Sequence, residues 1–284
     1  MPASAEGPRS TTRVTGVIGW PVEHSLSPAI HNAAFAELGL DWVYVPMPVP
    51  PGRVLAAIEG LAALGFAGAN VTMPHKTEVA SAVDELTEDA RRLRAVNTIV
   101  VVEGALEGHN TDAPGFDRFL RRDAAFDPAG RSVLIYGAGG AARAVALAAA
   151  QAGAREVAVA ARTAARAEAV AETLEGLGVE HRWLPFDAVT AESPELVVNA
   201  TPVGARGEEL PLPTLGPDTV VVDLLYRPAT TPLQARAREA GARVHGGLGL
   251  LLHQAAISFE LWTGQVPPLE TMSAAAVAAL AEPT

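Results

Sequence analysis

One stretch of the sequence decides the fold: Ser132-Val133-Leu134-Ile135-Tyr136-Gly137-Ala138-Gly139-Gly140-Ala141-Ala142. It begins as the apolar run of a buried strand, passes through a glycine-rich turn and continues as an alanine-rich helix. This order is the phosphate-binding start of a dinucleotide-binding unit, in which helix N–H groups favour negative charge. The alternative is a turn with a purely structural role. We predict that the cofactor binds at Gly137, Ala138, Gly139, Gly140 and Ala141.

The choice between the two nicotinamide cofactors depends on the end of the next predicted strand. NAD sites place an acid there, about 20 residues after the glycines, to bond the ribose hydroxyls. Here the strand is followed by Arg162, Thr163 and Arg166, with no carboxylate. Two guanidiniums and a hydroxyl suit a 2′-phosphate, so NADP (NADPH) is predicted, with solvated surface arginines as the alternative.

Short apolar runs alternate with helical patterns along most of the chain, which is typical of βαβ units and parallel sheets. In the first half the predicted strands are Val14–Gly19, Val43–Met47, Ala69–Thr72, Thr98–Val102 and Ala105–His109, the last two as a hairpin, with helices that start at Pro28, Arg53 and Glu78. In the second half they are Ser132–Tyr136, Glu156–Ala160, Leu196–Asn199, Val220–Asp223 and Arg243–His245, with helices over Ala141–Ala152, Ala165–Leu177 and Pro232–Ala240.

We therefore predict an α/β fold with two α/β domains. An N-terminal domain with a mixed sheet would bind the substrate and comprise residues 1–112 and 247–284, because two C-terminal helices are expected to return to it. A Rossmann-like NADP-binding domain would comprise residues 113–246. The length of 284 residues agrees, since single cores stop growing at roughly 250–300 residues, and two domains imply a cleft.

Composition excludes several classes of protein. The net charge of -11 argues against a nucleic-acid partner, because phosphate backbones are bound by clustered Lys and Arg. With 0 Cys and no histidine pair at metal-ligand spacing, no metal site is expected. No apolar run reaches the roughly 18–20 residues of a membrane span, and no secretion signal is recognisable, so we expect no membrane partner and a cytoplasmic location.

Lys76 is the single lysine among 21 basic residues. Coding bias towards arginine explains why the other lysines are missing, but not why this one remains. Arginine cannot release a proton near neutral pH, whereas a desolvated lysine can. Lys76 is therefore a candidate proton donor, with an ordinary surface lysine as the alternative.

Polar clusters lie at predicted strand ends and loops of the first half: His24-Ser25-Leu26-Ser27-Pro28, Asn70-Val71-Thr72-Met73-Pro74-His75-Lys76, and Asn110-Thr111-Asp112, with Asn97 before another strand. Ligands of open α/β sheets bind beyond the carboxyl ends of strands, so these clusters are expected to converge. Their neutral donors and acceptors suit a compact ligand with several hydroxyls. Ser27 before Pro28 also fits a helix N-cap, and a helix start with two hydroxyls suits a carboxylate.

These residues resemble a known family. The motifs His24-Ser25-x-Ser27-Pro28, Asn70-Val71-Thr72-x-Pro74-x-Lys76, Ala95-Val96-Asn97-Thr98, Asn110-Thr111-Asp112, Gly137-Ala138-Gly139-Gly140-Ala141, Asn199-Ala200-Thr201-Pro202-x-Gly204 and Gly247-x-Gly249-x-Leu251-x-x-Gln254 occur in the order seen in shikimate dehydrogenases. The resemblance covers nearly the whole chain, from about Gly16 to Trp262, and seven ordered motifs are more specific than any one of them.

The resemblance implies NADPH-dependent reduction of 3-dehydroshikimate to shikimate, a step of chorismate and aromatic amino-acid biosynthesis. It implies that Ser25, Ser27 and Tyr226 hold the ring carboxylate, and that the hydroxyls are bonded by Asn70, Thr72, Asn97, Asp112 and Gln254. Lys76 and Asp112 would be the catalytic pair at the substrate, and which of them transfers the proton stays open. A helix N-cap is the alternative for Asp112. On the cofactor side the motifs add Ala200, Thr201 and Gly247.

Other readings remain open. Ala161 replaces the asparagine usual before Arg162-Thr163, which removes one hydrogen bond on the adenosine side. Within the family, the substrate could be quinate or an aminated shikimate; outside it, the chain could sense a dinucleotide without catalysis. The partner is expected to be a small molecule, in a monomer or a homodimer. His31 and His253 are interpreted as packing residues with satisfied ring nitrogens.

Overall fold

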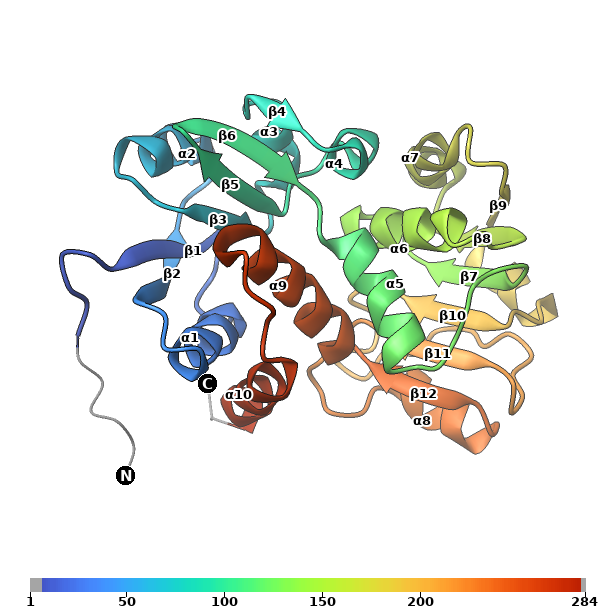
Figure 1. The fold of residues 1–284 in the computed structure, drawn as a ribbon. Coiled ribbons are helices and arrows are strands. Elements are labelled where there is room, and N and C mark those ends of the chain that lie inside the picture. Colours follow the sequence, from blue (N-terminus) through green and yellow to red (C-terminus); the bar gives the residue numbers. More distant parts are fainter. Residues whose placement is uncertain (1–6, 282–284) are drawn as a thin grey trace. The chain divides into compact units, whose positions relative to one another are not determined.

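The structure is a computed structural model that describes residues 7–281. It divides into two compact units (Figure 1). Unit 1 takes in the described residues through Thr111 and those from Ala255 onwards, and unit 2 is Asp112–Gln254. The division falls inside helix α9 (Leu248–Thr263), whereas the predicted boundary was at residue 247. The reason is packing: a Cβ on Gly115 would lie 2.8 Å from the Gln254 backbone nitrogen, so the first half of α9 packs closely on helix α5 of unit 2.

Unit 1 contains a mixed six-stranded sheet, as predicted. Its order is β2-β1-β3-β5-β6-β4, and the strands are β1 (Arg13–Gly19), β2 (Trp42–Pro48), β3 (Gly68–Val71), β4 (Glu85–Leu86), β5 (Thr98–Val102) and β6 (Ala105–His109). Strands β2, β1 and β3 are parallel, and β5 runs antiparallel to both β3 and β6. Glu103 (φ 51°) and Gly104 (φ 89°) form the tight turn of the predicted β5–β6 hairpin.

The helices of unit 1 are α1 (Ser27–Glu37), α2 (Val54–Ala63), α3 (Lys76–Ala80), α4 (Glu88–Leu93), the second half of α9, and α10 (Leu269–Ala281). Helix α1 buries Ile30, His31, Ala34 and Phe35, a stripe with helical spacing. Helix α10 packs beside α1, which confirms the predicted return of the C-terminal helices (Figure 1).

Two short elements of unit 1 were not predicted, and one helix starts earlier than expected. Strand β4 has two residues and helix α4 six, too few for a period to stand out. The helix expected from Glu78 begins at Lys76. Lys76 is therefore the first residue of a helix that directly follows the turn after β3.

Unit 2 is a Rossmann-like sheet of six parallel strands, in agreement with the predicted fold. The order is β12-β11-β10-β7-β8-β9, with β7 (Ser132–Tyr136), β8 (Glu156–Ala160), β9 (Glu180–Leu184), β10 (Leu196–Asn199), β11 (Val220–Asp223) and β12 (Arg243–Gly246). Its helices are α5 (Asp112–Arg122), α6 (Gly140–Gln151), α7 (Ala164–Leu174), the 3-10 turn Phe186–Ala191, α8 (Pro232–Glu239) and the first half of α9.

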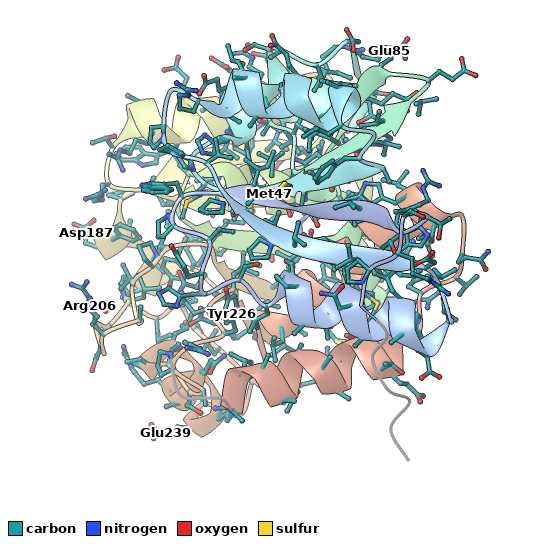
Figure 2. The ribbon with its side chains drawn as sticks, turned by 90° about the vertical axis from the view of Figure 1, so that its left-hand side faces the viewer. Met47, Glu85, Asp187, Arg206, Tyr226 and Glu239 are labelled. Atoms are coloured by element: carbon teal, nitrogen blue, oxygen red, sulfur yellow. The ribbon has the colours of Figure 1, made fainter. Side chains whose placement is uncertain are left out.

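Burial explains which elements of unit 2 the sequence revealed. Strands β10 and β11 are buried along their whole length and read as apolar runs. Strand β9 was missed because it is an edge strand with four exposed residues, so its sequence Glu-His-Arg-Trp-Leu shows no apolar pattern. Charged side chains such as Asp187, Arg206 and Glu239 project from the surface in Figure 2. Over residues 7–281 no helix has the length and apolarity of a membrane span.

Candidate functional site

The glycine-rich loop between β7 and α6 is built as a dinucleotide site requires. Gly137 has φ +105°, and a Cβ on it would lie 2.9 Å from Thr201 Cγ2 and 3.0 Å from the Ala200 carbonyl oxygen. Both the backbone conformation and the close approach therefore demand glycine here. A Cβ on Gly139 or Gly140, in contrast, would meet nothing within 4 Å, so the start of α6 is open.

The open side of this loop faces a cavity of about 610 Å³ within unit 2. That volume lies in the range of cofactor pockets, roughly 300–1,000 Å³. Its lining residues come from the loops that follow β7, β8 and β10, and from α7 and the 3-10 turn: Gly137, Ala138, Gly139, Ala161, Arg162, Ala165, Arg166, Ala169, Phe186, Ala200, Thr201, Pro202 and Val203.

The chemistry of this cavity fits NADP. The first turn of α6 carries no acidic residue, so its backbone N–H groups and the helix dipole can hold a pyrophosphate. Arg162 and Arg166 line the same cavity, which places two cations where a 2′-phosphate needs them. Thr163, the residue before α7, is exposed beside them but does not line the cavity.

The loop after β10 is held by Asn199. Its Oδ1 accepts hydrogen bonds from the Thr201 backbone nitrogen at 3.0 Å and from Thr201 Oγ1 at 2.7 Å, while its Nδ2 donates to Val203 and to Asp223 Oδ1. Burial raises the pKa of Asp223, and this effect outweighs that of the hydrogen bonds which the Asp223 carboxylate accepts. The Thr201 hydroxyl proton is used in the bond to Asn199 and is not directed at a ligand. The contribution of this loop to the cavity is therefore its shape.

Besides Thr163, three of the predicted cofactor residues do not line this cavity: Gly140, Ala141 and Gly247. Gly247 has a structural explanation, since a Cβ on it would collide with the carbonyl oxygen of Leu224. Phe186 lines the cavity but was not predicted, because it lies in a short 3-10 turn without a recognisable motif. Ala161 also lines the cavity, and its carbonyl accepts a hydrogen bond from Trp183 Nε1 at 3.2 Å.

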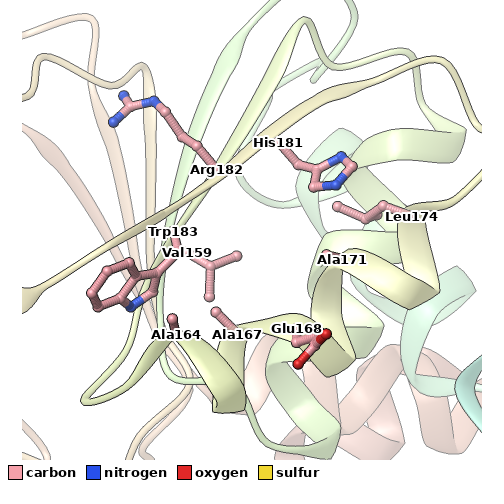
Figure 3. A pocket seen from close by; sticks show the side chains of 9 residues that line it. All are labelled: Val159, Ala164, Ala167, Glu168, Ala171, Leu174, His181, Arg182 and Trp183. Carbon is pink, nitrogen blue, oxygen red and sulfur yellow. The ribbon is translucent and has the colours of Figure 1, made fainter.

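A second, smaller hollow lies between α7 and β9 and shares no lining residue with the first (Figure 3). Its volume is about 150 Å³, and its walls are mostly apolar. Arg182, at its rim, is held in ion pairs with Glu156 and Glu192. The volume is below that of ordinary ligand pockets, so the larger cavity is the candidate cofactor site.

In unit 1 the polar clusters meet at one end of the sheet. Asn70, near the end of β3, lies opposite Thr98 at the start of antiparallel β5, and Thr98 lies opposite His109 at the end of β6. Topology therefore brings Asn70, Asn97 and Thr111 to the same sheet end. Lys76 lies there too, because its carbonyl accepts a hydrogen bond of 2.9 Å from the Val96 backbone nitrogen.

Asn70 and Asn97 belong to a buried hydrogen-bond network in unit 1. Asn70 Nδ2 lies 3.0 Å from both Thr98 Oγ1 and Ser258 Oγ and 3.2 Å from the Asn97 carbonyl oxygen. Asn97 Oδ1 accepts from Thr98 Oγ1 and from the Thr111 nitrogen, and Asn97 Nδ2 donates to Thr111 Oγ1. The two amides are thus held rigidly, which suits residues that must recognise hydroxyl groups.

The alternative interpretation of Ser27 as a helix N-cap does not hold. Helix α1 starts at Ser27 itself, and Leu26, which occupies the N-cap position in a helical conformation, makes no side-chain capping hydrogen bond. Ser25 Oγ instead accepts the Ser27 backbone N–H at 3.3 Å. The half-buried Ser25 and the buried Ser27 therefore stand together at a helix start, in keeping with the predicted carboxylate site.

The other predicted substrate residues are placed as follows. Thr72 is half-buried, and its backbone nitrogen donates to the Ile18 carbonyl at 2.8 Å. Asp112 is half-buried and is the first residue of α5. Tyr226 is 37% exposed in the loop after β11 (Figure 2). Gln254 lies on α9, and its Nε2 donates to the Leu251 carbonyl at 2.9 Å. Asp112, Tyr226 and Gln254 belong to unit 2.

Two histidines differ from expectation. His31 is a packing residue, but within residues 7–281 neither of its ring nitrogens has a hydrogen-bond partner. Burial lowers its pKa from 6.5 to about 3, so it packs as a neutral ring among aromatic side chains. His253 Nε2 lies 3.1 Å from Asp123 Oδ2, whereas its Nδ1 has no partner among the described residues. Those residues also contain no cluster of three metal-ligating side chains.

Family models cover most of the chain. Residues 17–99 match the model described as a shikimate dehydrogenase substrate-binding domain, residues 122–202 match shikimate / quinate 5-dehydrogenase, and residues 247–277 match a shikimate 5'-dehydrogenase C-terminal domain. The first of these segments contains Ser25, Ser27, Asn70, Thr72, Lys76 and Asn97.

Similar proteins cover the chain almost completely. Shikimate dehydrogenase (NADP(+)) of Methanopyrus kandleri is 48% identical over 271 residues, which are 92% of this chain and 93% of that protein. The structure of shikimate 5-dehydrogenase from Listeria monocytogenes with shikimate and NAD has a TM-score of 0.89 at 35% identity, over 95% of this chain and 98% of that one.

A third comparison links the fold to both ligands. The structure of shikimate 5-dehydrogenase from Thermus thermophilus with NADP(H) and shikimate has a TM-score of 0.84 at 38% identity, over 94% of this chain and 100% of that chain. The predicted resemblance is thereby confirmed by sequence and by fold. This chain belongs to the shikimate dehydrogenase family.

Proposed function

We propose that this protein reduces 3-dehydroshikimate to shikimate with NADPH, reversibly, as an oxidoreductase of chorismate and aromatic amino-acid biosynthesis. The observation that carries the proposal is the pairing of two kinds of site in one chain. Unit 2 has a dinucleotide cavity with two arginines, and unit 1 gathers neutral amides and hydroxyls with a lysine at one sheet end. Relatives with 48% identity and below carry the same activity in their names.

The cofactor residues are assigned from the cavity and from the motifs beside it. NADPH, when bound, supplies the hydride for reduction of the ketone. We assign the pyrophosphate to the backbone from Gly137 to Ala141 and the 2′-phosphate to Arg162, Thr163 and Arg166. Ala200 and Thr201 would shape the opposite wall. A contribution of Gly247 stays a prediction, since its packing on Leu224 already accounts for the glycine.

The substrate residues come from unit 1, from the start of α5, from the loop after β11 and from α9. Ser25 and Ser27, with Tyr226, are assigned to the ring carboxylate, and Asn70, Thr72, Asn97, Asp112 and Gln254 to the hydroxyls. Reduction of a ketone builds negative charge on its oxygen, which a nearby ammonium can neutralise. We assign to Lys76 the donation of a proton from Nζ to that oxygen, and to Asp112 the orientation of the Lys76 ammonium.

A matrix of initial rates tests the proposal: shikimate and quinate, each with NADP and with NAD. Shikimate with NADP should give the highest kcat/KM. Absence of turnover with this pair would refute the proposal. Comparable turnover of quinate, or use of NAD within about tenfold of NADP, would favour the family rival that acts on quinate. An aminated shikimate in the same assay tests the remaining sibling substrate.

Two further points are proposed. The reaction consumes a small-molecule substrate and NADPH, which is consistent with action in the cytoplasm, and subcellular fractionation would test that location. A monomer or a homodimer is expected, and light scattering coupled to size-exclusion chromatography would distinguish them.

A further inference from the structure

Helix α1 forms hydrogen bonds with the backbone of Tyr44 on strand β2, at the open edge of the sheet. Strand β2 is an edge strand, and on one side Tyr44 pairs with Thr15 of β1. On the other side Asn32 of α1 replaces a neighbouring strand, because its Nδ2 donates to the Tyr44 carbonyl at 2.9 Å and its Oδ1 accepts the Tyr44 N–H at 2.8 Å. The Tyr44 backbone is therefore fixed on both sides.

The Tyr44 ring is held as firmly as its backbone. His31, the residue before Asn32, stacks on it with ring centroids 4.5 Å apart and an interplanar angle of 9°. Trp262 of α9 packs at 6.1 Å with a tilt of 51°. The side chain is 2% exposed, so its hydroxyl is directed to one place in the protein interior.

The Tyr44 hydroxyl forms a hydrogen bond with a residue that we assign to the substrate site. It donates to Asn70 Oδ1 at 2.7 Å. Burial raises the pKa of Tyr44 far above its ordinary value, so the phenol keeps its proton and remains a donor. The hydroxyl thus fixes the oxygen of one amide at the proposed hydroxyl site.

The hydrogen bonds around Asn70 use its donor groups and leave capacity on its acceptor oxygen. Its two N–H groups are used by Thr98, Ser258 and the Asn97 carbonyl, so Nδ2 has no capacity left. Its Oδ1 accepts from Tyr44 and retains a second lone pair. An amide held in this way can offer a ligand only an acceptor, and the group that it recognises must therefore be a donor such as a hydroxyl.

We propose that Tyr44 is a positioning residue for the substrate: it orients Asn70 so that Oδ1 accepts a ring hydroxyl. This inference deepens the proposed function and rests on it. His31 and Asn32 serve the same purpose one step further away, since they hold the Tyr44 ring and backbone. None of these three residues is part of the site assigned above.

Tyr44→Phe tests the role of the hydroxyl, because it keeps the stacked ring and removes one oxygen. A buried polar group that loses its partner costs about 1–2 kcal/mol, which corresponds to a factor of roughly 5–30. We expect the KM for shikimate to rise by about fivefold to thirtyfold, while kcat and the KM for NADP change by less than about twofold. Shikimate affinity measured by calorimetry should fall by the same factor as KM rises.

Thr173→Val is the matched control. It also removes a buried hydroxyl, one on helix α7 of unit 2 that donates to the Ala169 carbonyl at 2.9 Å. It should lower stability by an amount similar to Tyr44→Phe and leave the KM for shikimate unchanged. An equal KM in Tyr44→Phe and Thr173→Val would overturn the inference.

A double-mutant cycle asks whether Tyr44 acts through Asn70. In an Asn70→Ala background, Tyr44→Phe should change the KM by less than about twofold, because the residue that it orients is gone. Independent, multiplicative effects would reject the positioning role. If Tyr44→Phe does not fold, Asn32→Ala replaces it in the same cycle, because it releases the Tyr44 backbone. Positioning through Tyr44 predicts non-additive effects of Asn32→Ala and Asn70→Ala on KM, and additive effects overturn the inference.

The outcomes separate the two proposals. A wild-type protein without activity on shikimate and NADP rejects the proposed function, and the inference falls with it. A wild-type protein that is active, with Tyr44→Phe indistinguishable from it in KM, rejects the inference alone.

Discussion

Replacing His31 with Phe should remove the loss of stability that the burial of His31 predicts for the wild-type protein below neutral pH. His31 is 0% exposed, and burial lowers its pKa from 6.5 to about 3. The folded protein therefore keeps His31 neutral at pH values where the unfolded chain binds a proton. Stability is complete above the unfolded pKa of 6.5 and is lost as the pH falls towards 3.

The expected loss of unfolding free energy follows from the difference between the two pKa values of His31. Each pH unit between the two pKa values costs about 1.4 kcal/mol. At pH 5 the wild-type protein should have lost about 2 kcal/mol of its unfolding free energy through His31 alone, a large share of the roughly 5–15 kcal/mol typical of a domain. No charged partner offsets this, because desolvation is the one cause of the shift.

The assay is urea unfolding of wild type and His31→Phe at pH 7 and pH 5. Phe keeps the aromatic packing against Tyr44 and Phe259 but cannot titrate. Burial also lowers the pKa values of His109 and His245, but both groups titrate in wild type and variant and cancel in the difference. His31→Gln serves as a second variant without a titrating ring. Equal pH dependence in wild type and variants would refute the assigned burial of a neutral His31.

Three further predictions concern the proposed chemistry. Lys76→Ala should lower kcat by about 10²–10⁴-fold while shikimate still binds in calorimetry. Lys76→Arg should recover little activity, because arginine cannot release the proton. An unchanged kcat would reject Lys76 as the proton donor. Arg162→Ala should raise the KM for NADP by about tenfold to a hundredfold, since a charge-assisted hydrogen bond is lost, with little change in the KM for NAD. Arg206→Ala is the control, because Arg206 is exposed and lies outside the cavity. Equal rises in KM for both cofactors would contradict the assignment of Arg162. Gly137→Ala should weaken NADP binding in a fluorescence titration, because φ +105° and the 2.9 Å approach of Thr201 leave no room for a Cβ, whereas Gly216→Ala has open space and should bind normally.

Most of the fold could be predicted because its strands are buried. Strands that lie in the middle of a parallel sheet are buried on both faces, so β7 and β10 are apolar apart from one polar residue at an end, and this makes them visible in the sequence. Edge elements have no such requirement. Strand β9 is exposed over four of its residues, and β4 has only two residues, so neither leaves a pattern that periodicity can detect.

The cofactor site was predictable to the extent that its residues are local in sequence. Gly137, Gly139 and the pair Arg162 and Arg166 lie directly after two adjacent strands, and parallel pairing brings such loops to one end of the sheet. Phe186 reaches the same cavity from a 3-10 turn after β9, the strand that the sequence did not reveal. Its position depends on an element without a signal, so its role could not be foreseen.

Tyr44 shows a different limit. A tyrosine in a strand is ordinary, and nothing near it in the sequence indicates that its hydroxyl reaches Asn70, 26 residues away. The signal lies elsewhere, in the dipeptide His31-Asn32 of α1. Polar side chains on the inner side of a helix lose free energy of hydration unless they form compensating contacts. Here His31 stacks on the Tyr44 ring and Asn32 forms hydrogen bonds with the Tyr44 backbone.

Motifs therefore combine residues that face the ligand with residues that build the loop around it, and only the geometry separates the two. Asn199 belongs to a cofactor motif, yet its amide is occupied by Thr201, Val203 and Asp223. Gly247 belongs to another, yet Leu224 already forbids a side chain there. Transferring a motif residue by residue thus overestimates the contacts with ligand. It also misses Tyr44, which lies in no motif and holds Asn70 of one motif through its hydroxyl, so the proposed substrate geometry depends on a residue that no motif contains.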